Sequence, residues 1–286
     1  MVEKNSSLVA SFSSVQISEK LKKMTIYEQI GKSYDLTRCA DPEIAKRLAI
    51  KLQIKSDSSY LDVACGTGNY TLALAKQAGI WHGLDQSKKM INAAINKSNA
   101  IAWQVGEAEA LPYHNCSFSG VLCTLAIHHF AALTSAFQEI YRVLRAGCFV
   151  LFTATPEQMS KYWLVEYFPE AIYKSAEQMP SFERIKESLK EAGFKSVDIE
   201  LYYISESLQD LFLYSGKHRP EIYLDENVRS GISTFALLAS AKEIAAGCEK
   251  LAADIHTGRI TEIVKKYESD QGDYLFVIAE KVLIMN

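Results

Sequence analysis

Apolar blocks with two different periods alternate along the first half of the chain. Short apolar runs predict strands, and they are SSYLDVA, IWHGLD, IAWQVG, FSGVLCTL and CFVLFTAT. The last run is nearly continuous, which predicts burial on both faces of the sheet. The segments between them have a helical period, as in residues 131–145, where one stripe comprises Leu133, Phe137, Ile140, Tyr141 and Leu144. This alternation predicts parallel crossovers and an α/β, doubly wound sheet, whose ligands lie beyond the carboxyl ends of the strands.

Capping residues indicate where several helices begin and end. Asp41 followed by Pro42 is typical of a helix start, and it predicts a helix near residues 42–53. Ser87 is a suitable cap for the helix that follows the second strand. Gly193 is placed to end the helix that begins after Ser181, because glycine adopts the left-handed conformation of a helix end at little cost.

The rest of the chain divides by composition. Residues 1–18 are rich in serine and lack a helical period, which predicts a mobile leader, and a helix is expected near 18–35. The alternation is interrupted at about 157–180 and 206–268, and both stretches predict helical insertions. A single domain over residues 19–286 is therefore expected. In the second insertion the run FALLASAKEIAAGCEKLAADI is strongly amphipathic, and the sixth and seventh strands are FKSVDIELYYI and GDYLFVIAEKVLI.

Composition and charge argue against several classes of protein. The 286 residues are 48% hydrophobic, which is enough for one large domain, and a net charge of −3 argues against binding nucleic acid. No apolar run is long enough to predict a membrane span, and the N-terminus lacks the apolar core of a secretory signal. The six cysteines form no CxxC pair, which favours buried thiols in a reducing cytoplasm over disulfides or a metal site.

The first strand ends in a glycine turn, within the run YLDVACGTGNYT. Gly66 and Gly68 supply a GxG, but Thr71 stands where a dinucleotide fingerprint has its third glycine. This substitution argues against an NAD(P)-dependent oxidoreductase. Taken alone, the turn is equally well explained as a plain connection from a strand to a helix.

Two acidic residues follow the next two strands. Asp85 ends the second strand, where a carboxylate can accept both hydroxyls of a ribose. Glu107 follows the third strand and could accept from the amine of an adenine, while the N–H of Ala108 meets a ring nitrogen. Each acid alone could be an exposed surface residue, but three consecutive strand ends with these groups predict a nucleoside site.

Together these motifs resemble the class I S-adenosylmethionine-dependent methyltransferases, of the small-molecule kind related to ubiquinone and menaquinone biosynthesis enzymes. The resemblance covers roughly residues 25–155 and 181–204, and it is carried by LDVACGTG, GLDQSKKM, GEAEALPYHNCSFSGVLCTLAIHHF and EIYRVLRAGCFVLF. It implies a single methyltransferase domain with a Rossmann-like, mostly parallel seven-stranded sheet whose last strand is antiparallel, carrying helical cap insertions. The chain departs from the family at Ala64, usually a glycine, and at 146–148, usually Pro-Gly-Gly. An alanine at position 64 is tolerable if its φ is negative.

The resemblance also implies the cofactor S-adenosylmethionine, released as S-adenosylhomocysteine, and a set of contacts to it. Carbonyls near Ala64 and Leu125 would hold the methionine amine, and Asp62 would face the cationic ligand. Asp85 would bind the ribose, Gln86 and Met90 would flank the adenine, and Glu107 with Ala108 would bind its edge. The full set of expected cofactor-binding residues is Tyr27, Tyr34, Arg38, Asp62, Ala64, Gly66, Gly68, Asp85, Gln86, Met90, Glu107, Ala108 and Leu125.

The N-terminal run IYEQIGKSYDLTR is similar to a helix that covers the cofactor in the family. By this likeness Tyr27 and Tyr34 would close over the cofactor, and Arg38 would pair with the carboxylate of its methionine. The alternative is a stripe of tyrosines that packs a surface helix, with Arg38 exposed to solvent.

Two histidines, His128 and His129, follow the fourth strand at the mouth of the expected site. An imidazole there could deprotonate an acceptor, or the pair could only pack and form hydrogen bonds. Several aromatic residues could line an apolar acceptor pocket or pack the helices on each other: Trp163, Tyr167, Phe168, Tyr173, Phe212 and Tyr214. Lys217, His218 and Arg219 could meet a carboxylate, but a solvated charge run is the simpler interpretation.

The expected function is methyl transfer to the oxygen or carbon of a small, partly apolar molecule in the cytoplasm. A non-catalytic protein that binds the same nucleoside is the alternative that the sequence leaves open. The sequence does not predict the acceptor or the oligomeric state.

Overall fold

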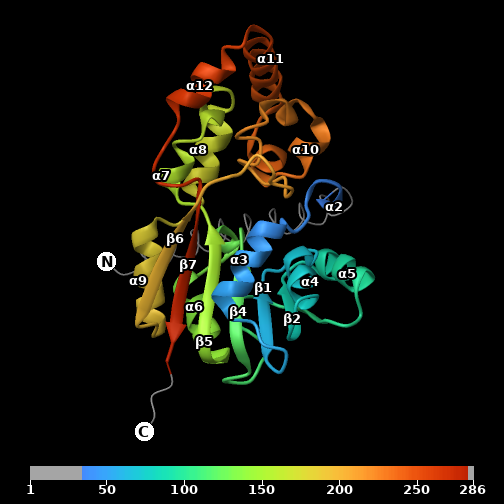
Figure 1. Ribbon diagram of the computed structural model, residues 1–286, viewed down its shortest axis with the longest axis vertical. Helices are drawn as coiled ribbons and strands as arrows, with labels where there is room; N and C mark the ends of the chain where they lie inside the picture. The colour runs from blue at the N-terminus through green and yellow to red at the C-terminus, as the bar shows by residue number, and fades with distance from the viewer. Residues whose placement is uncertain (1–33, 283–286) are drawn as a thin grey trace, which may run out of the picture.

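The computed structural model describes residues 34–282 and is built on one seven-stranded sheet (Figure 1). The strands lie in the order β3-β2-β1-β4-β5-β7-β6, and β7 is antiparallel to both of its neighbours while the other pairs are parallel. Their bounds are β1 Ser59–Val63, β2 Ile80–Asp85, β3 Ala102–Val105, β4 Phe118–Thr124, β5 Leu144–Thr153, β6 Ser196–Tyr202 and β7 Tyr274–Lys281. This arrangement confirms the expected fold class. The predicted leader and the first predicted helix up to residue 33 lie outside the described residues.

Helices cover both faces of the sheet, as expected for a doubly wound fold. One face packs against α3 and α4 through a core that includes Leu48, Leu74 and Phe152, and the other packs against α6 and α9 through Phe137, Leu189 and other apolar side chains. The bounds of the helices beside the sheet are α3 Pro42–Leu52, α4 Asn69–Ala75, α5 Lys88–Lys97, α6 Leu133–Val143 and α9 Phe182–Ala192.

The predicted caps are present. The side chain of Asp41 accepts hydrogen bonds from the backbone N–H groups of Glu43 and Ile44, both at 3.0 Å, and Ser87 accepts one from Met90 N at 3.3 Å. Gly193 closes α9 in the left-handed conformation, with φ of 111°. These contacts stabilise the helix ends because they satisfy backbone groups that have no partner inside the helix.

The fifth strand begins earlier than the sequence pattern predicts. It starts at Leu144, directly after α6, and a register shift lies in its pairing with β4 between Phe118 and Gly120. Gly147 adopts a φ of +132° at this irregularity, and a Cβ there would come within 2.2 Å of the carbonyl oxygen of Ser119. The segment that is a Pro-Gly-Gly turn in the family is therefore part of a bulged strand here.

The two insertions lie together beyond the carboxyl end of β5 and form a helical layer that we call the cap, residues 154–180 and 203–273 (Figure 1). Its elements are α7 Pro156–Met159, η2 Trp163–Glu166, α8 Pro169–Glu177, η3 Pro220–Leu224, α10 Glu226–Ser230, η4 Thr234–Leu238, α11 Ala241–Thr257 and α12 Ile260–Lys266. The long amphipathic run is interrupted, because η4 is a π-helical turn and Ser240 caps a new helix by accepting from Glu243 N at 3.1 Å.

Five of the six aromatic residues of the insertions pack inside the cap. Their exposed fractions are at most 3%, and they are Trp163, Tyr167, Phe168, Phe212 and Tyr214. Tyr214 stacks on Tyr162 with ring centroids 3.9 Å apart. For these five, the interpretation as the lining of an acceptor pocket is wrong, and the helix-packing alternative is correct. Tyr173 is 64% exposed and fits neither description.

The basic triplet in the second insertion has internal partners. Lys217 Nζ donates to Asp273 Oδ2 at 2.8 Å, Arg219 donates to the carbonyl of Leu208 at 2.6 Å, and a ring nitrogen of His218 lies 2.9 Å from the carbonyl of Ile204. Asp273 stands directly before β7, so the pair fastens the cap to the sheet. These residues are therefore neither a solvated charge run nor a site for the carboxylate of a ligand.

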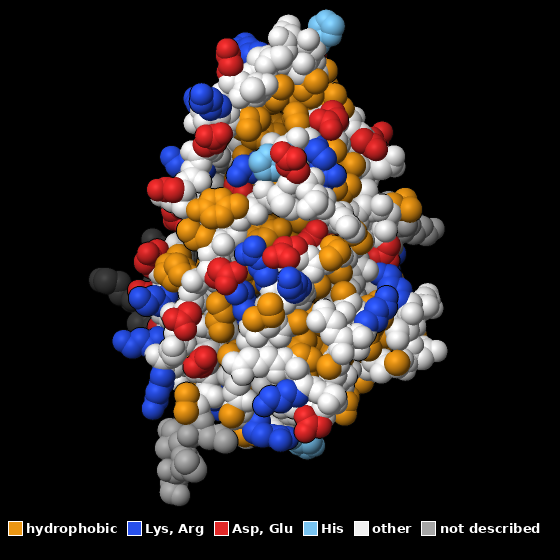
Figure 2. Space-filling model, in the orientation of Figure 1, with side chains coloured by type: hydrophobic (Ala, Val, Ile, Leu, Met, Phe, Trp, Pro, Cys, Tyr) orange, Lys and Arg blue, Asp and Glu red, His pale blue; other side chains and the backbone are white. Residues whose placement is uncertain are grey.

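The surface shown in Figure 2 carries Lys and Arg side chains among Asp and Glu side chains rather than in one large basic patch. This distribution agrees with the small net charge of −3. Within residues 34–282, no helix has both the length and the apolar character needed to cross a membrane.

Candidate active site

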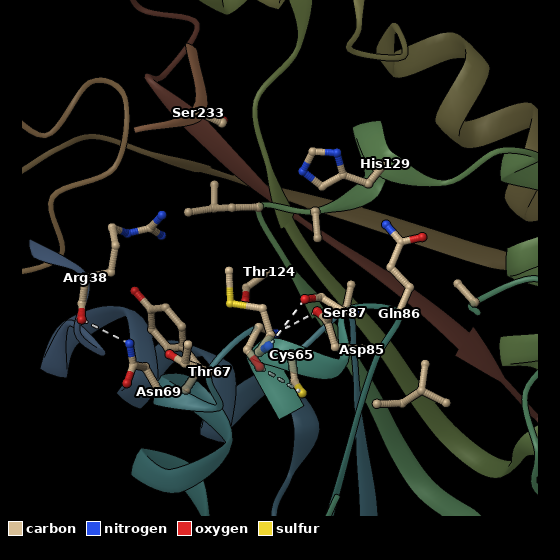
Figure 3. A pocket seen from close by; sticks show the side chains of 18 of the residues that line it. Arg38, Cys65, Thr67, Asn69, Asp85, Gln86, Ser87, Thr124, His129 and Ser233 are labelled. Carbon is tan, nitrogen blue, oxygen red and sulfur yellow. Dashed lines mark hydrogen bonds between the residues drawn. The ribbon is translucent and has the colours of Figure 1, made fainter. Parts of the chain in front are cut away.

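A cavity of about 360 Å³ lies at the carboxyl ends of β1, β2 and β4, where ligands of doubly wound sheets bind (Figure 3). The sheet supplies the glycine turn, the end of β2 and the end of β4, and the cap supplies Asp210, Gly231 and Ser233. Ten of the residues expected from the sequence line it: Arg38, Ala64, Gly66, Asp85, Gln86, Met90, Ala108, Leu125, His128 and His129.

Three other expected residues, Asp62, Gly68 and Glu107, do not belong to this lining. Asp62 is buried, Gly68 packs against the sheet, and Glu107 is exposed beside the cavity. Tyr27 lies outside the described residues, and Tyr34 begins the short helix α2, Tyr34–Thr37, although its side chain is not described.

The backbone at Ala64 is left-handed. Its φ is +59°, so the negative φ at which an alanine is readily tolerated is not adopted, and Leu125 has a φ of +54°. The left-handed conformation costs an L-residue about 1–2 kcal/mol, a cost that a glycine at position 64 would avoid. Both strained residues are the ones whose carbonyls are expected to hold the methionine amine.

The two glycines of the turn serve different purposes. Gly66 has a φ of +57°, and a Cβ on it would meet nothing within 4 Å, so this glycine leaves the turn open toward the cavity. Gly68 has a φ of +77°, and a Cβ on it would lie 2.3 Å from the indole ring of Trp103. Gly68 is thus needed for close packing of the turn on β3, which explains its place outside the lining.

Asp62 is a buried carboxylate with one unsatisfied oxygen. Its Oδ2 accepts a hydrogen bond of 2.6 Å from the hydroxyl of Thr71, and its Oδ1 has no hydrogen-bond partner. Burial raises the pKa of Asp62 to about 7, and the nearby charge of Asp85 adds to the rise. Thr71, in the place of a dinucleotide fingerprint's third glycine, is thus committed to Asp62. The unsatisfied oxygen fits a cationic ligand such as S-adenosylmethionine.

Asp85 joins the end of β2 to the glycine turn. Its Oδ1 accepts from Ser87 N at 2.8 Å, and its Oδ2 accepts from Gly66 N at 2.9 Å. Burial raises the pKa of Asp85, and the hydrogen bonds from these two amides act in the opposite direction. A carboxylate has about four lone-pair sites, so this one can also accept the two hydroxyls of a ribose.

At the far end of the cavity the structure places Glu109 rather than Glu107 in the wall. Glu109 Oε1 accepts from the backbone N–H groups of Ala131 at 2.6 Å and Ala132 at 3.2 Å. It thereby holds the loop that follows the two histidines. The sequence shows two acids two residues apart after β3, and their spacing alone does not indicate which one faces a ligand.

Asp35 fastens α2 to the glycine turn. Its Oδ1 accepts from the hydroxyl of Thr67 at 2.6 Å and from Lys97 Nζ at 2.7 Å, and Asn69 Nδ2 donates to the carbonyl of Arg38 at 3.0 Å. These contacts keep the N-terminal segment over the turn, which agrees with the likeness to a cofactor-covering helix.

Arg38 is held by a carboxylate of the cap. Its Nε donates to Asp210 Oδ1 at 2.6 Å and its Nη2 to Asp210 Oδ2 at 3.2 Å, while the hydroxyl of Tyr70 donates to Oδ2 at 3.1 Å. The side chain of Arg38 is 14% exposed, so the alternative of a solvated arginine is wrong. The sequence pattern does not point to Asp210, because it lies in an insertion outside the family resemblance.

The histidines stand beside the end of β4, in the short helix η1, Ile127–His129. Their rings are 3.8 Å apart, and both line the cavity. In Figure 3 the imidazole of His129 projects into the cavity on the side away from Arg38, with Asp85 below and Ser233 above. Among residues 34–282 no group of three or more His, Cys, Asp or Glu side chains is arranged to hold a metal ion.

Comparison with known proteins agrees with this geometry. Residues 61–152 match the family model of a methyltransferase domain. The demethylmenaquinone methyltransferases of Chlorobaculum tepidum and Lactobacillus johnsonii are 30% and 31% identical over 176 and 182 residues, covering 54% of this chain and 72% and 75% of those proteins. A solved structure of a putative methyltransferase from an antibiotic biosynthesis pathway of Anabaena variabilis is 33% identical, with a TM-score of 0.78, and the match covers 85% of this chain and 98% of that one.

The residues matched by the family model include β2, β3 and β4, most of β1 and β5, the glycine turn and Asp85. Within residues 34–282, the antiparallel strand β7 lies between β5 and β6. With a carboxylate at the end of β2 and a turn that lacks the third glycine of a dinucleotide site, the chain belongs to the class I S-adenosylmethionine-dependent methyltransferases.

Proposed function

We propose that this enzyme methylates an oxygen or a carbon of a small, partly apolar molecule that binds between the sheet and the cap. The observation that carries this proposal is a single cavity that extends from Asp85 and Gly66 to His129 and Ser233. Its sheet side has the groups suited to a nucleoside. The cap supplies Asp210, Gly231 and Ser233, and the segment after β4 adds the apolar Leu125 and Phe130, as expected for a small, partly apolar acceptor.

When bound, S-adenosylmethionine supplies an electrophilic methyl group on a positively charged sulfur. The protein then has to hold cofactor and acceptor in line, which can supply a large part of the rate. We assign the amino-acid end of the cofactor to Arg38 and the carbonyls of Ala64 and Leu125. The proposed contacts to the ribose and adenine are Asp85, Gln86, Met90, Glu107 and Ala108, with Tyr27 and Tyr34 closing over them and Asp62, Gly66 and Gly68 shaping the turn.

His129 is the proposed general base. The imidazole of His129 would accept the proton of an acceptor's O–H as that oxygen takes the methyl group, while the cofactor's S–CH3 bond breaks and S-adenosylhomocysteine leaves as a neutral thioether. The ring projects into the cavity, and the hydroxyl of Ser233 in the cap is placed to bind the acceptor (Figure 3). His128 packs against His129 and is proposed to orient it.

The cap is the part of the protein that we assign to the acceptor. We propose that the insertions at about 157–180 and 206–268 belong to a single methyltransferase domain of residues 19–286 and supply its acceptor side. The curated relatives are named for demethylmenaquinone, which supports a small molecule as the acceptor class. All six cysteines are free thiols, which supports action in the reducing cytoplasm.

Calorimetry with S-adenosylhomocysteine, followed by transfer of a labelled methyl group, tests the proposal. The acceptor panel should contain phenols and enolisable carbonyl compounds, matched with amines and thiols of similar size. We expect product with an oxygen or carbon acceptor, and a loss of about 10²–10⁴-fold in kcat for His129→Asn with unchanged cofactor affinity. The matched variant His128→Asn should lose less. Transfer to amines alone contradicts the proposed acceptor class, and binding without turnover of any acceptor supports the non-catalytic alternative.

A further inference from the structure

A short segment of the cap, residues 209–211, is tied to the segment that carries Arg38. Leu211 N donates to the carbonyl of Thr37 at 3.1 Å, and Gln209 N donates to Asp41 Oδ2 at 3.0 Å. These two hydrogen bonds flank Asp210 on both sides. The position of the Asp210 carboxylate relative to residues 37–41 is therefore set by the backbone rather than by a flexible side chain alone.

Asp210 is the point at which three parts of the molecule meet. Its side chain is 1% exposed and accepts from Arg38 Nε and Nη2 as well as from the hydroxyl of Tyr70. Tyr70 belongs to α4, which begins directly after the glycine turn. One buried carboxylate of the cap thus joins the N-terminal segment to the first helix of the sheet layer.

The bonded edge of the guanidinium determines where the rest of Arg38 lies. An arginine paired through Nε and Nη2 is fixed in plane as well as in position, because both bonds lie in the plane of the group. Figure 3 shows Arg38 at the end of the cavity near Thr67 and Asn69, and Gln86 at the opposite end, with Asp85 between them. A ligand whose ribose is bound by Asp85 and whose base lies toward Gln86 would extend its remaining end toward Arg38.

We propose that Asp210 is a positioning residue that holds the guanidinium of Arg38 where it receives the α-carboxylate of the cofactor's methionine. The cap thereby builds one end of the cofactor site in addition to the acceptor side. This inference rests on the cofactor placement proposed above. A fixed guanidinium loses little side-chain entropy on binding a carboxylate, whereas an untethered one has to be ordered by the ligand.

Asp210 could also have the opposite effect and weaken the binding of a carboxylate to Arg38. A carboxylate so close to Arg38 partly neutralises its charge, so Asp210 would weaken carboxylate binding if orientation contributed little. The buried geometry favours orientation, because removal of Asp210 leaves both Arg38 and the hydroxyl of Tyr70 without their buried acceptor. The two possibilities predict changes of opposite sign in ligand affinity.

The test compares two ligands by calorimetry on the full chain. S-adenosylhomocysteine has the amino-acid end, and 5′-methylthioadenosine has the same nucleoside without it. For Asp210→Asn we expect the affinity for S-adenosylhomocysteine to fall about tenfold or more, as for loss of a charge-assisted contact, and the affinity for 5′-methylthioadenosine to change less than about twofold.

Asp254→Asn is the matched control. Asp254 is also a buried aspartate of the cap, it accepts from the hydroxyl of Tyr167 at 3.0 Å, and it lies 3.8 Å from an arginine, Arg259, but it does not line the cavity. Its replacement should leave the affinities for both ligands unchanged. Melting temperatures of the two variants separate loss of folding from loss of binding.

Arg38→Lys provides a second route if Asp210→Asn does not fold. It keeps the positive charge and removes the planar fork, and it should also weaken S-adenosylhomocysteine while sparing 5′-methylthioadenosine. Equal losses for both ligands, or an unchanged or higher affinity for S-adenosylhomocysteine in Asp210→Asn, would overturn the inference. If the unmodified protein binds neither ligand, the cofactor placement itself fails, and that outcome is distinct from failure of the role of Asp210.

Discussion

Replacing Asp62 with asparagine tests the electrostatics of the glycine turn. The Asp62 carboxylate is completely buried, with Thr71 bonded to one oxygen and no hydrogen-bond partner on the other. Burial first, and the charge of Asp85 second, raise its pKa from the ordinary 3.8 to about 7. Near neutral pH the ionised Asp62 carboxylate therefore destabilises the folded protein, because this carboxylate is buried there and solvated in the unfolded chain.

The magnitude follows from that rise in the pKa. The folded-state pKa exceeds the unfolded one, so the contribution of Asp62 to stability is fully present below about pH 4 and is lost as the pH rises to about 7. At about 1.36 kcal/mol per pKa unit, the whole loss is about 4 kcal/mol, of which about 2–3 kcal/mol falls between pH 5 and pH 8. An asparagine at this position does not titrate, so its stability lacks this component.

Urea denaturation of the ligand-free protein at pH 5 and pH 8 measures this component. The free energy of unfolding of the unmodified protein should fall by about 2–3 kcal/mol relative to Asp62→Asn between the two pH values. His82, whose pKa is lowered by burial, is present in both proteins and cancels in the comparison. The thiols of Cys65 and Cys123 stay neutral in this range, because burial raises their pKa values well above normal.

An altered hydrogen bond in Asp62→Asn shifts its stability by the same amount at both pH values, so only the pH dependence carries the prediction. A stability difference between the two proteins that is equal at pH 5 and pH 8 would refute a raised pKa for Asp62. A cationic ligand bound near Asp62 favours its ionised form, so the affinity for S-adenosylmethionine should rise with pH over the same range.

Three further substitutions test the turn and its acid. Ala64→Gly should raise the free energy of unfolding by about 0.5 kcal/mol in urea titrations, because relief of the left-handed φ exceeds the added freedom of the unfolded chain; a loss of stability contradicts this. Gly68→Ala should lower the free energy of unfolding by about 2–3 kcal/mol, because the added Cβ clashes with Trp103. Gly258 has a similar φ of +78° but open space around it, so Gly258→Ala should lower the free energy of unfolding by only about 1 kcal/mol, and equal losses would exclude the clash. Asp85→Asn should weaken S-adenosylhomocysteine about 10–100-fold by calorimetry, and an unchanged affinity removes the ribose assignment.

Helix ends and strand alternation could be predicted from the sequence because they depend on local interactions. The bonds of Asp41 to Glu43 and Ile44 span two or three residues, so the residue types alone indicate the contact. The burial of the central strands follows from continuous apolar runs in the same way. The start of β5 at Leu144 could not be predicted, because it depends on a bulge in the pairing with the neighbouring strand.

The conformation of Ala64 shows how tertiary context overrides a local preference. An alanine in isolation avoids a positive φ, so residue type alone suggests that alanine fits this turn only with a negative φ. In the folded protein Cys65 N donates to the carbonyl of Leu84 at 3.0 Å and Gly66 N donates to Asp85, so β2 determines the path of the turn on both sides. The residue at position 64 then adopts the φ that this path requires, whatever its side chain.

In the cap, the sequence pattern predicts which helix faces are buried but not what covers them. Its amphipathic periodicity indicates that one face of each helix is buried, but it does not say whether a ligand or another helix covers that face. The aromatic residues from Trp163 to Tyr214 pack on one another, and the cavity is instead lined by small and polar cap residues such as Gly231 and Ser233. A Cβ on Gly231 would come within 2.1 Å of Thr37 Oγ1, so this glycine allows the cap to approach α2 closely.

The ion pair of Arg38 and Asp210 could not be predicted from the sequence pattern either. The two residues are 172 positions apart, and one lies within the family resemblance while the other lies in an insertion outside it. Residue types alone therefore indicate an arginine near the cofactor but not the group that orients it. Because the orienting carboxylate belongs to the cap, the cap cannot vary independently of the cofactor site. A cap that changes to admit another acceptor has to keep a carboxylate at this position, or else cofactor affinity changes together with acceptor choice.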